Sequence, residues 1–255
     1  IKNATQGQKT EKNIIDGITI NGIDLNYDSN SNTYYLPINL VENEQITLKI
    51  TIYSNYNIKS KIGDKEFAKQ IKFDEKISYD KEFQVDIESL LYKQSCAIKF
   101  TNIPSISLNF DEKEIGNEYT YSEFSITNPN YKENNSEYQY YADSKVRYRG
   151  SSTAGYPKKS YRIKLEKNID FGLLGMNKSK TWLLDALVTD SSCLRTKIAS
   201  DIWNKMNEDL NTEEHIDLNA KFVELYVNGE YIGLYLLKET IDENLLKLDK
   251  DTGVL

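Results

Sequence analysis

The first hundred residues consist of short runs in which apolar side chains alternate with polar ones or follow one another directly. Clusters of turn-forming residues separate the runs, for example Asn21-Gly22 and Gly63-Asp64. Alternation with a period of two is typical of half-buried strands, and short strands at this spacing favour an antiparallel sandwich. The apolar runs cover residues 14–20, 33–38, 46–53, 67–73, 83–87 and 97–100. We therefore predict an Ig-like β-sandwich with a supporting role.

A domain boundary is predicted close to Pro104, which follows the last of these runs. Proline has no N–H to give to a central strand ladder, so it favours the edge or end of a sheet. New strands are expected at residues 106–110 and 122–127. The chain thus divides into an accessory domain at residues 1–104 and a second domain at residues 105–255. The second domain is expected to be mixed, so the fold class of the whole chain is α+β.

An amphipathic helix is predicted after Asp190-Ser191-Ser192, whose side chains can cap its first turn. Its apolar positions recur every four residues and are expected to lie in the core. Arg195 lies in the first turn, where a cation gains nothing from the helix dipole, so a specific acidic partner is expected. That partner is Asp190, Asp185 or a carboxylate of the last hairpin. The apolar stripe consists of Leu194, Ile198, Ile202 and Met206, widened by Ala199 and Trp203.

Asn228-Gly229 predicts a β-hairpin with a type I′ turn, because both central positions of that turn need positive φ. Regular two-residue pairing would place Tyr226 opposite Tyr231, Glu224 opposite Gly233 and Phe222 opposite Tyr235. The other face, with Val223, Leu225, Ile232 and Leu234, is predicted to be core. The first face would offer a gap above Gly233 beside the carboxylate of Glu224.

Composition narrows the chemistry. The chain has 255 residues, a formal net charge of -7, one His and two Cys. So few of these side chains exclude most His-based catalysis and a His/Cys zinc cluster. No apolar run approaches the roughly 20 residues that cross a bilayer. We expect no nucleic-acid partner, no membrane insertion and no tightly bound metal. Because the chain begins at Ile1 without Met, we also expect a processed or truncated product.

Cations gather in one part of this acidic chain. Residues 145–167 contain eight Lys or Arg and one Glu, arranged as two strand-like segments around a loop of small residues. Such a loop brings backbone N–H groups close to an anion, and phosphate is the first candidate. Strand parity places Lys158 with Ser160 and Arg162 on a polar face, and Lys159 on a mostly apolar face. Either lysine could contact the phosphates. The candidate phosphate ligands are Arg149, Gly150, Ser151, Ser152, Lys158, Lys159 and Arg162.

Several blocks in a fixed order resemble the CotH family of atypical protein kinases, first associated with bacterial spore coats. They are the cationic run at 147–165, Leu173-Leu174-Gly175-Met176, Trp182-Leu183-Leu184, the segment at 190–195 and the hairpin at 223–239. The resemblance covers roughly residues 105–240. It implies the N-terminal lobe of a kinase-like domain, with a mostly antiparallel sheet and one or two helices.

The resemblance further implies that a longer parent protein transfers the γ-phosphoryl group of ATP to Ser or Thr of a protein, using Mg²⁺ or Mn²⁺. The substrate would be a coat or surface protein, and the location the spore coat or the cell exterior. Glu224 or Glu239 would orient a cation or line the cleft, while Asp190 and Arg195 would be structural. The family's catalytic and metal-binding acids lie in a later segment, so this stretch alone is expected to be inactive. The alternative is a non-catalytic scaffold whose basic strands bind an acidic glycan or protein.

Overall fold

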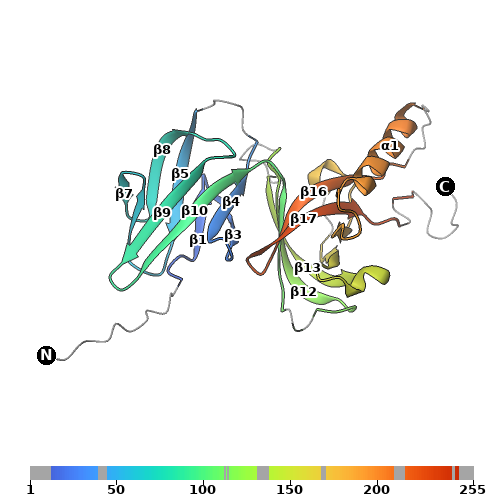
Figure 1. Cartoon of the computed structure of the whole chain (residues 1–255), viewed down its shortest axis with the longest axis horizontal. Helices are drawn as coiled ribbons and strands as arrows, with labels where there is room; N and C mark the ends of the chain where they lie inside the picture. Colours follow the sequence, from blue (N-terminus) through green and yellow to red (C-terminus); the bar gives the residue numbers. More distant parts are fainter. Residues whose placement is uncertain are drawn as a thin grey trace. The chain divides into compact units, whose positions relative to one another are not determined.

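The computed structural model describes residues 13–39, 45–111, 113, 115–130, 138–167, 171–209, 216–242 and 245–246. It divides into two compact units, Ile1–Asn102 and Ile103–Leu255, each described below by itself (Figure 1). The predicted ability of residues 1–104 to fold alone stays a prediction. The end of the chain at Leu255 lies outside the described residues.

The N-terminal unit contains two sheets whose buried side chains form one hydrophobic core. One sheet has the order β2-β1-β5-β8 and the other has the order β3-β4-β10-β9-β6-β7. The strands are β1 (Gly17–Ile20), β2 (Ile23–Asp24), β3 (Asn26–Asp28), β4 (Thr33–Pro37), β5 (Gln45–Tyr53), β6 (Ile58–Ile62), β7 (Lys65–Phe67), β8 (Gln70–Lys76), β9 (Glu82–Ser89) and β10 (Lys93–Thr101). This arrangement is that of a β-sandwich, and its specifically Ig-like character stays a prediction.

The strand pair β9 and β10 shows why these sequences form sheets. Every second residue of β9 is buried and the residues between them are exposed, as its alternating sequence predicts. On the exposed face, oppositely charged residues lie directly across from each other. Lys93 is opposite Glu88 and Lys99 is opposite Glu82, with ion pairs of 3.0 Å and 2.7 Å. Such cross-strand pairs stabilise a sheet modestly.

The C-terminal unit is built around a closed barrel of seven strands in the order β11-β12-β13-β14-β15-β17-β16. The barrel strands are β11 (Ser105–Asn109), β12 (Thr120–Thr127), β13 (Gln139–Arg149), β14 (Ser160–Leu165), β15 (Thr181–Asp185), β16 (Ala220–Val227) and β17 (Glu230–Glu239). Two short 3-10 helices, Ser152–Gly155 and Leu173–Gly175, and one α-helix, α1 (Arg195–Asp209), complete its described part. The barrel interior is filled by a second apolar core that includes Trp182, Phe124 and Tyr235.

The predicted α+β class, with a kinase-like N-terminal lobe after the sandwich, is wrong. The described part of the C-terminal unit holds one α-helix, and its sheet closes into a barrel. Closure depends on β11, which pairs in parallel with β16, for example Ile106 with Leu225. More than a hundred residues separate these two strands, and alternation within a strand carries no information about a partner so far away.

The hairpin of β16 and β17 has the predicted turn but another register. Asn228 and Gly229 both have positive φ, 51° and 78°, which confirms the turn. Tyr226 lies opposite Tyr231 as predicted, but a bulge follows, and Leu225 rather than Glu224 lies opposite Gly233. One extra residue on β17 reverses which side chains of that strand face inward.

The bulge accounts for two further corrections. Val223 lies opposite Tyr235, and Phe222 lies opposite Leu236. Tyr235 is therefore fully buried in the barrel core with Val223, whereas the prediction placed it on the outer face.

The apolar stripe of α1 is exposed, so its prediction as core is wrong. Ile198, Ile202, Trp203 and Met206 are each about half exposed. The helix is held to the barrel through polar side chains instead. Asn204 accepts a hydrogen bond from the Leu218 N–H at 2.8 Å, and Asn207 donates one to the Ile216 carbonyl at 3.1 Å. Periodicity identifies the stripe but does not say which face of the helix meets the protein.

Candidate functional site

The outer face of the barrel carries cations on two neighbouring strands, β13 and β14. The inner positions of these strands, such as Val146 and Ile163, are fully buried, so the residues between them point outward. The register places Lys145 opposite Lys164 and Arg147 opposite Arg162. Like charges directly opposite each other destabilise a sheet. This pattern therefore indicates a role other than stability.

Lys158 lies just before β14 and reaches the inner face of β17. Its Nζ donates a hydrogen bond to the Leu234 carbonyl at 2.6 Å and lies 4.3 Å from the centre of the Tyr235 ring. It also occupies the space above Gly233, where a Cβ atom would lie 3.6 Å from Nζ. Burial lowers the pKa of Lys158, while the nearby Cys193 and Asp185 act in the opposite direction. The gap predicted above Gly233 is thus filled by an ammonium group.

Asp185, at the end of β15, lies at the centre of several cations. Its carboxylate accepts a hydrogen bond from Lys238 Nζ at 2.6 Å and one from the Leu187 N–H at 3.1 Å. Burial by itself would raise the pKa of Asp185, but these hydrogen bonds and the charges of Lys238 and Arg149 hold it below its ordinary value. The carboxylate therefore stays ionised and holds Lys238, and its charge also interacts with those of Arg149 and Lys158.

The loop after β13 is shaped by Gly150. Its φ of 121° favours glycine, and a Cβ atom here would lie 2.3 Å from Thr153 Oγ1. Ser151 and Ser152 are exposed. Lys159 is turned toward this loop, where its Nζ donates to the Ala154 carbonyl at 2.6 Å. Of the two lysines left open by the sequence, Lys158 contacts β17 and is within range of the charge of Asp185, and Lys159 supports the loop.

Arg162, in the middle of β14, holds an unpaired donor. Its register neighbours are Arg147 and Leu183. In the described part of the chain, its Nε is one of two buried side-chain atoms without a hydrogen-bond partner. An unsatisfied buried donor costs about 1–3 kcal/mol, and a guanidinium group more. An anion at this position would remove that penalty.

The second unsatisfied atom is Oε2 of Glu224 on β16. Burial raises the pKa of this carboxyl to about 7. Glu224 lies opposite Leu234 of β17 and Ser105 of β11. Glu224 therefore lies on β16, next to β17, whereas Lys158 donates a hydrogen bond to the backbone carbonyl of Leu234 on β17.

Glu239 lies at the other end of β17 from Gly233 and has structural contacts. Its carboxylate accepts hydrogen bonds from the backbone N–H and side-chain amide of Asn177 and from those of Asn219, at 2.5 to 3.5 Å. Burial raises its pKa, although the hydrogen bonds oppose that shift. Glu239 therefore links two loops through hydrogen bonds, and its contacts are not those of a phosphate site.

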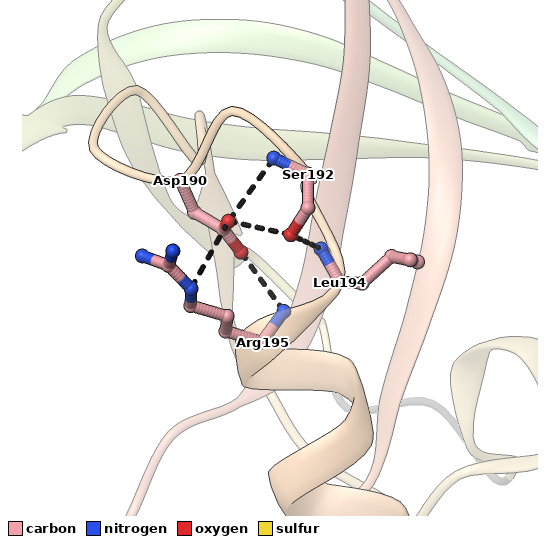
Figure 2. A network of polar contacts seen from close by, with 4 residues as sticks. All are labelled: Asp190, Ser192, Leu194 and Arg195. Atoms are coloured by element: carbon pink, nitrogen blue, oxygen red, sulfur yellow. Dashed lines mark hydrogen bonds and ion pairs between the residues drawn. The ribbon is translucent and has the colours of Figure 1, made fainter.

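Asp190 and Arg195 meet at the start of α1, as Figure 2 shows. Asp190 accepts hydrogen bonds from the Ser192 hydroxyl at 2.6 Å and from the Arg195 N–H at 2.8 Å. The guanidinium Nε of Arg195 lies 3.7 Å from the same carboxylate. The hydroxyl of Ser192, followed by the other donors, lowers the pKa of Asp190. Of the three partners considered for Arg195, the structure provides Asp190.

Arg149 and Lys158 thus both interact with the charge of Asp185, which together with Lys238 the sequence had not placed in this site. Asp185 had been considered only as a partner for Arg195. Its signal was modest: a carboxylate that ends the apolar run Trp182-Leu183-Leu184. Glu239 is not part of this group.

Two searches of the described residues were negative. They contain no group of three or more His, Cys, Asp or Glu side chains that could hold a metal ion. Among the same residues, no helix has both the length and the apolar character needed to span a membrane.

Comparison with known proteins gives one match. Residues 146–254 match the model of the family described as CotH kinase protein. The match begins in the middle of β13 and includes the whole group around Asp185. A search of curated proteins finds no match.

Proposed function

Because residues 146–254 belong to the CotH kinase protein family, we propose that the barrel unit binds the phosphates of ATP as part of a protein kinase. The reaction would transfer the γ-phosphoryl group to Ser or Thr hydroxyls of a protein. Family membership supports the reaction class, and the group around Asp185 supports the location of the phosphates.

The observation that carries this proposal is the excess of positive charge around one carboxylate. Lys238 pairs with Asp185 at 2.6 Å, and the charges of Arg149 and Lys158 also interact with this carboxylate, so three cations share one anion. Lys158 is also partly desolvated and is bound to a neutral carbonyl rather than to a carboxylate. Partly buried cations interact with an anion more strongly than cations in water do. The negative charges of a polyphosphate chain would balance the positive charges of these residues.

In this arrangement Lys158 and Arg149 would hold and neutralise the phosphates, and Asp185 would position the cations. Phosphoryl transfer depends mainly on positioning and on stabilisation of charge at the phosphate oxygens. The contact of Lys158 with Tyr235 and Leu234 fixes the direction of its ammonium group before the ligand arrives. Such preorganisation lowers the entropic cost of reaching a reactive geometry.

Two neighbouring features would complete phosphate binding. The exposed loop that starts at Gly150 would cover the phosphates with the hydroxyls of Ser151 and Ser152. Arg162 would give its unpaired Nε–H to a phosphate oxygen, since guanidinium groups bind phosphate with directional hydrogen bonds.

Kinases of this reaction class use a divalent metal that bridges phosphate oxygens. The described residues do not fit that role, because they bring together no group of three candidate ligands.

Nucleotide binding is tested by titrating a fluorescent ATP analogue into the 255-residue chain. Lys158→Ala should weaken binding by about ten- to hundredfold, because a hydrogen bond to a charged group contributes roughly 1.5–3 kcal/mol. Arg149→Ala should weaken it by a similar factor. Lys221→Ala is the matched control, since Lys221 is an exposed lysine on β16 of the same barrel. Equal affinities of wild type, Lys158→Ala and Arg149→Ala would contradict the proposed site.

Phosphoryl transfer is tested separately from nucleotide binding. From the resemblance we expect this stretch alone to label no protein substrate when it is incubated with radioactive ATP and Mg²⁺ or Mn²⁺. A longer product of the same gene, if one is made, is expected to label it. Metal-dependent labelling by the 255-residue chain would contradict that expectation and leave the nucleotide site standing.

We also propose that the substrate is a spore-coat or surface protein, which the family's association with spore coats supports. Antibody labelling of intact spores and vegetative cells tests the location. Labelling confined to the cytoplasm would contradict it.

A further inference from the structure

A second basic region lies at the other end of β13 and β14. It is a hollow of about 430 Å³. On β13, Lys145 lies four residues from Arg149, so these two residues are about 13 Å apart along the strand. Its lining consists of Glu118, Tyr119, Lys145, Lys164, Leu165, Glu166 and Lys180.

Three lysines reach this hollow from three adjacent chain segments. Lys145 and Lys164 are register partners on β13 and β14. The carbonyl of Lys180 accepts a hydrogen bond from the Leu165 N–H at 2.8 Å, which fixes Lys180 beside the end of β14. Adjacent strands lie about 5 Å apart, so the three lysines lie on neighbouring segments of the barrel wall. Such a row destabilises the sheet unless an anion lies over it.

The walls of the hollow are rigid on one side. The guanidinium group of Arg147 lies over the Tyr119 ring at 5.2 Å, and its Nη1 donates to the Asn117 carbonyl at 3.3 Å. This contact orients the ring, and Arg147 itself lies outside the lining of the hollow. Leu165 is fully buried and forms part of the floor.

The two carboxylates that line the hollow determine which anion can displace them and bind to the lysines. Glu166 pairs with Lys145 at 3.1 Å in an exposed position, and Glu118 also lines the hollow. The lining therefore holds three lysines and two carboxylates, an excess of one positive charge, and Arg147 beside Tyr119 adds a cation outside the lining. A monoanionic carboxylate gains little by replacing Glu166, whereas a phosphate monoester carries roughly -1.5 to -2 and three acceptor oxygens. The small volume also favours a single compact dianion over the evenly spaced charges of a polymer.

We propose that this hollow binds a phosphorylated Ser or Thr side chain of a protein. The proposal goes beyond the nucleotide site and does not depend on it, although a protein Ser/Thr kinase would produce this ligand. A substrate protein bound here through one phosphorylated residue would place a neighbouring segment of its own chain beside the barrel.

The test uses fluorescence anisotropy with a labelled peptide that carries one phosphoserine among Gly, Ala and Ser residues. Wild-type chain should bind it at least about tenfold more tightly than the same peptide with Ser or Glu at that position, because of the dianion's extra charge. The double variant Lys164→Ala/Lys180→Ala should lose that preference. Lys221→Ala should keep it, and so should Lys158→Ala, which affects the nucleotide site alone.

Melting temperatures of all variants show whether they are folded, and exposed Lys164→Glu provides a second charge change at the same place. Equal binding of the phosphorylated and unphosphorylated peptides would overturn the proposal. So would unchanged binding by both lysine variants. Lysine-dependent binding of an acidic glycan such as polygalacturonate, with no binding of the phosphopeptide, would overturn it in favour of a glycan site. Because no nucleotide is present, these outcomes are independent of the ATP titration.

Discussion

Two strand pairs of this protein differ in the charges that lie opposite each other across the two strands. In the sandwich, β9 and β10 place Glu88 opposite Lys93 and Glu82 opposite Lys99. In the barrel, β13 and β14 place Lys145 opposite Lys164 and a second pair of cations beside it. Both pairs are antiparallel. The first arrangement stabilises its sheet, and the second is compatible with folding only because the rest of the barrel is stable.

The buried carboxylates show the same contrast within one unit. Glu239 accepts hydrogen bonds from two asparagines, whereas Glu224 has a buried oxygen without a partner. Buried polar groups that make hydrogen bonds stabilise a structure. A buried polar group without a hydrogen-bond partner indicates a position where function has outweighed stability. The predictions below change members of each class and compare the results.

The largest effect is expected at Glu239. Glu239→Ala should lower the free energy of unfolding by about 3 kcal/mol, because the amides of Asn177 and Asn219 lose their buried, charged acceptor. Glu239→Gln keeps one acceptor oxygen and should lose less. Urea denaturation followed by Trp fluorescence measures both, since Trp182 lies opposite Glu239 in the barrel. A stable Glu239→Ala variant would remove the contrast between the two carboxylates.

A smaller, pH-dependent effect is expected at Glu224. Its pKa is about 7 in the folded chain, against an ordinary value of 4.5. A raised carboxyl pKa favours the folded state at low pH, and this contribution is lost as the pH rises through about 7. Glu224→Gln stays neutral, so it should exceed the wild type in stability by about 1–2 kcal/mol above pH 7. The difference should vanish below about pH 4.5. A difference that does not depend on pH would show that Glu224 does not titrate as described.

The smallest effect separates the two strand pairs themselves. Lys164→Glu places a carboxylate opposite Lys145 and should raise the free energy of unfolding by about 0.5 kcal/mol. Lys99→Glu places a carboxylate opposite Glu82 and should lower it by a similar amount. Both lysines are on exposed strand faces, so the two changes are matched in chemistry. Shifts of the same sign in the two variants would contradict the comparison.

Much of the local structure could be predicted from the sequence. The alternating runs mark most strands, Asn228-Gly229 gives its turn, and Asp190 caps the helix that follows it. Each of these features depends on residues within a few positions of one another, where dihedral preferences and parity decide the outcome. The cationic outer face of β13 and β14 was predictable for the same reason.

The missing parts depend on contacts between distant segments. The bulge after Tyr226 turns Tyr235 into the core, and neither strand shows this by itself. The parallel pairing of β11 with β16 closes the barrel, and the polar contacts of Asn204 turn the apolar stripe of α1 outward. Asp185 joins the candidate site only because β15 ends between β14 and β17.

The central claim is that cations of β13 and β14 are retained for an anionic ligand at the expense of stability. Arg162→Leu tests it most directly, because this change removes a like-charge pair and an unsatisfied buried Nε beside Leu183. The free energy of unfolding and the dissociation constant for ATP are measured for the variant and the wild type in one buffer. The variant should be more stable by about 1 kcal/mol and should bind ATP at least about tenfold more weakly. A variant that is less stable and binds ATP as the wild type does would contradict the claim.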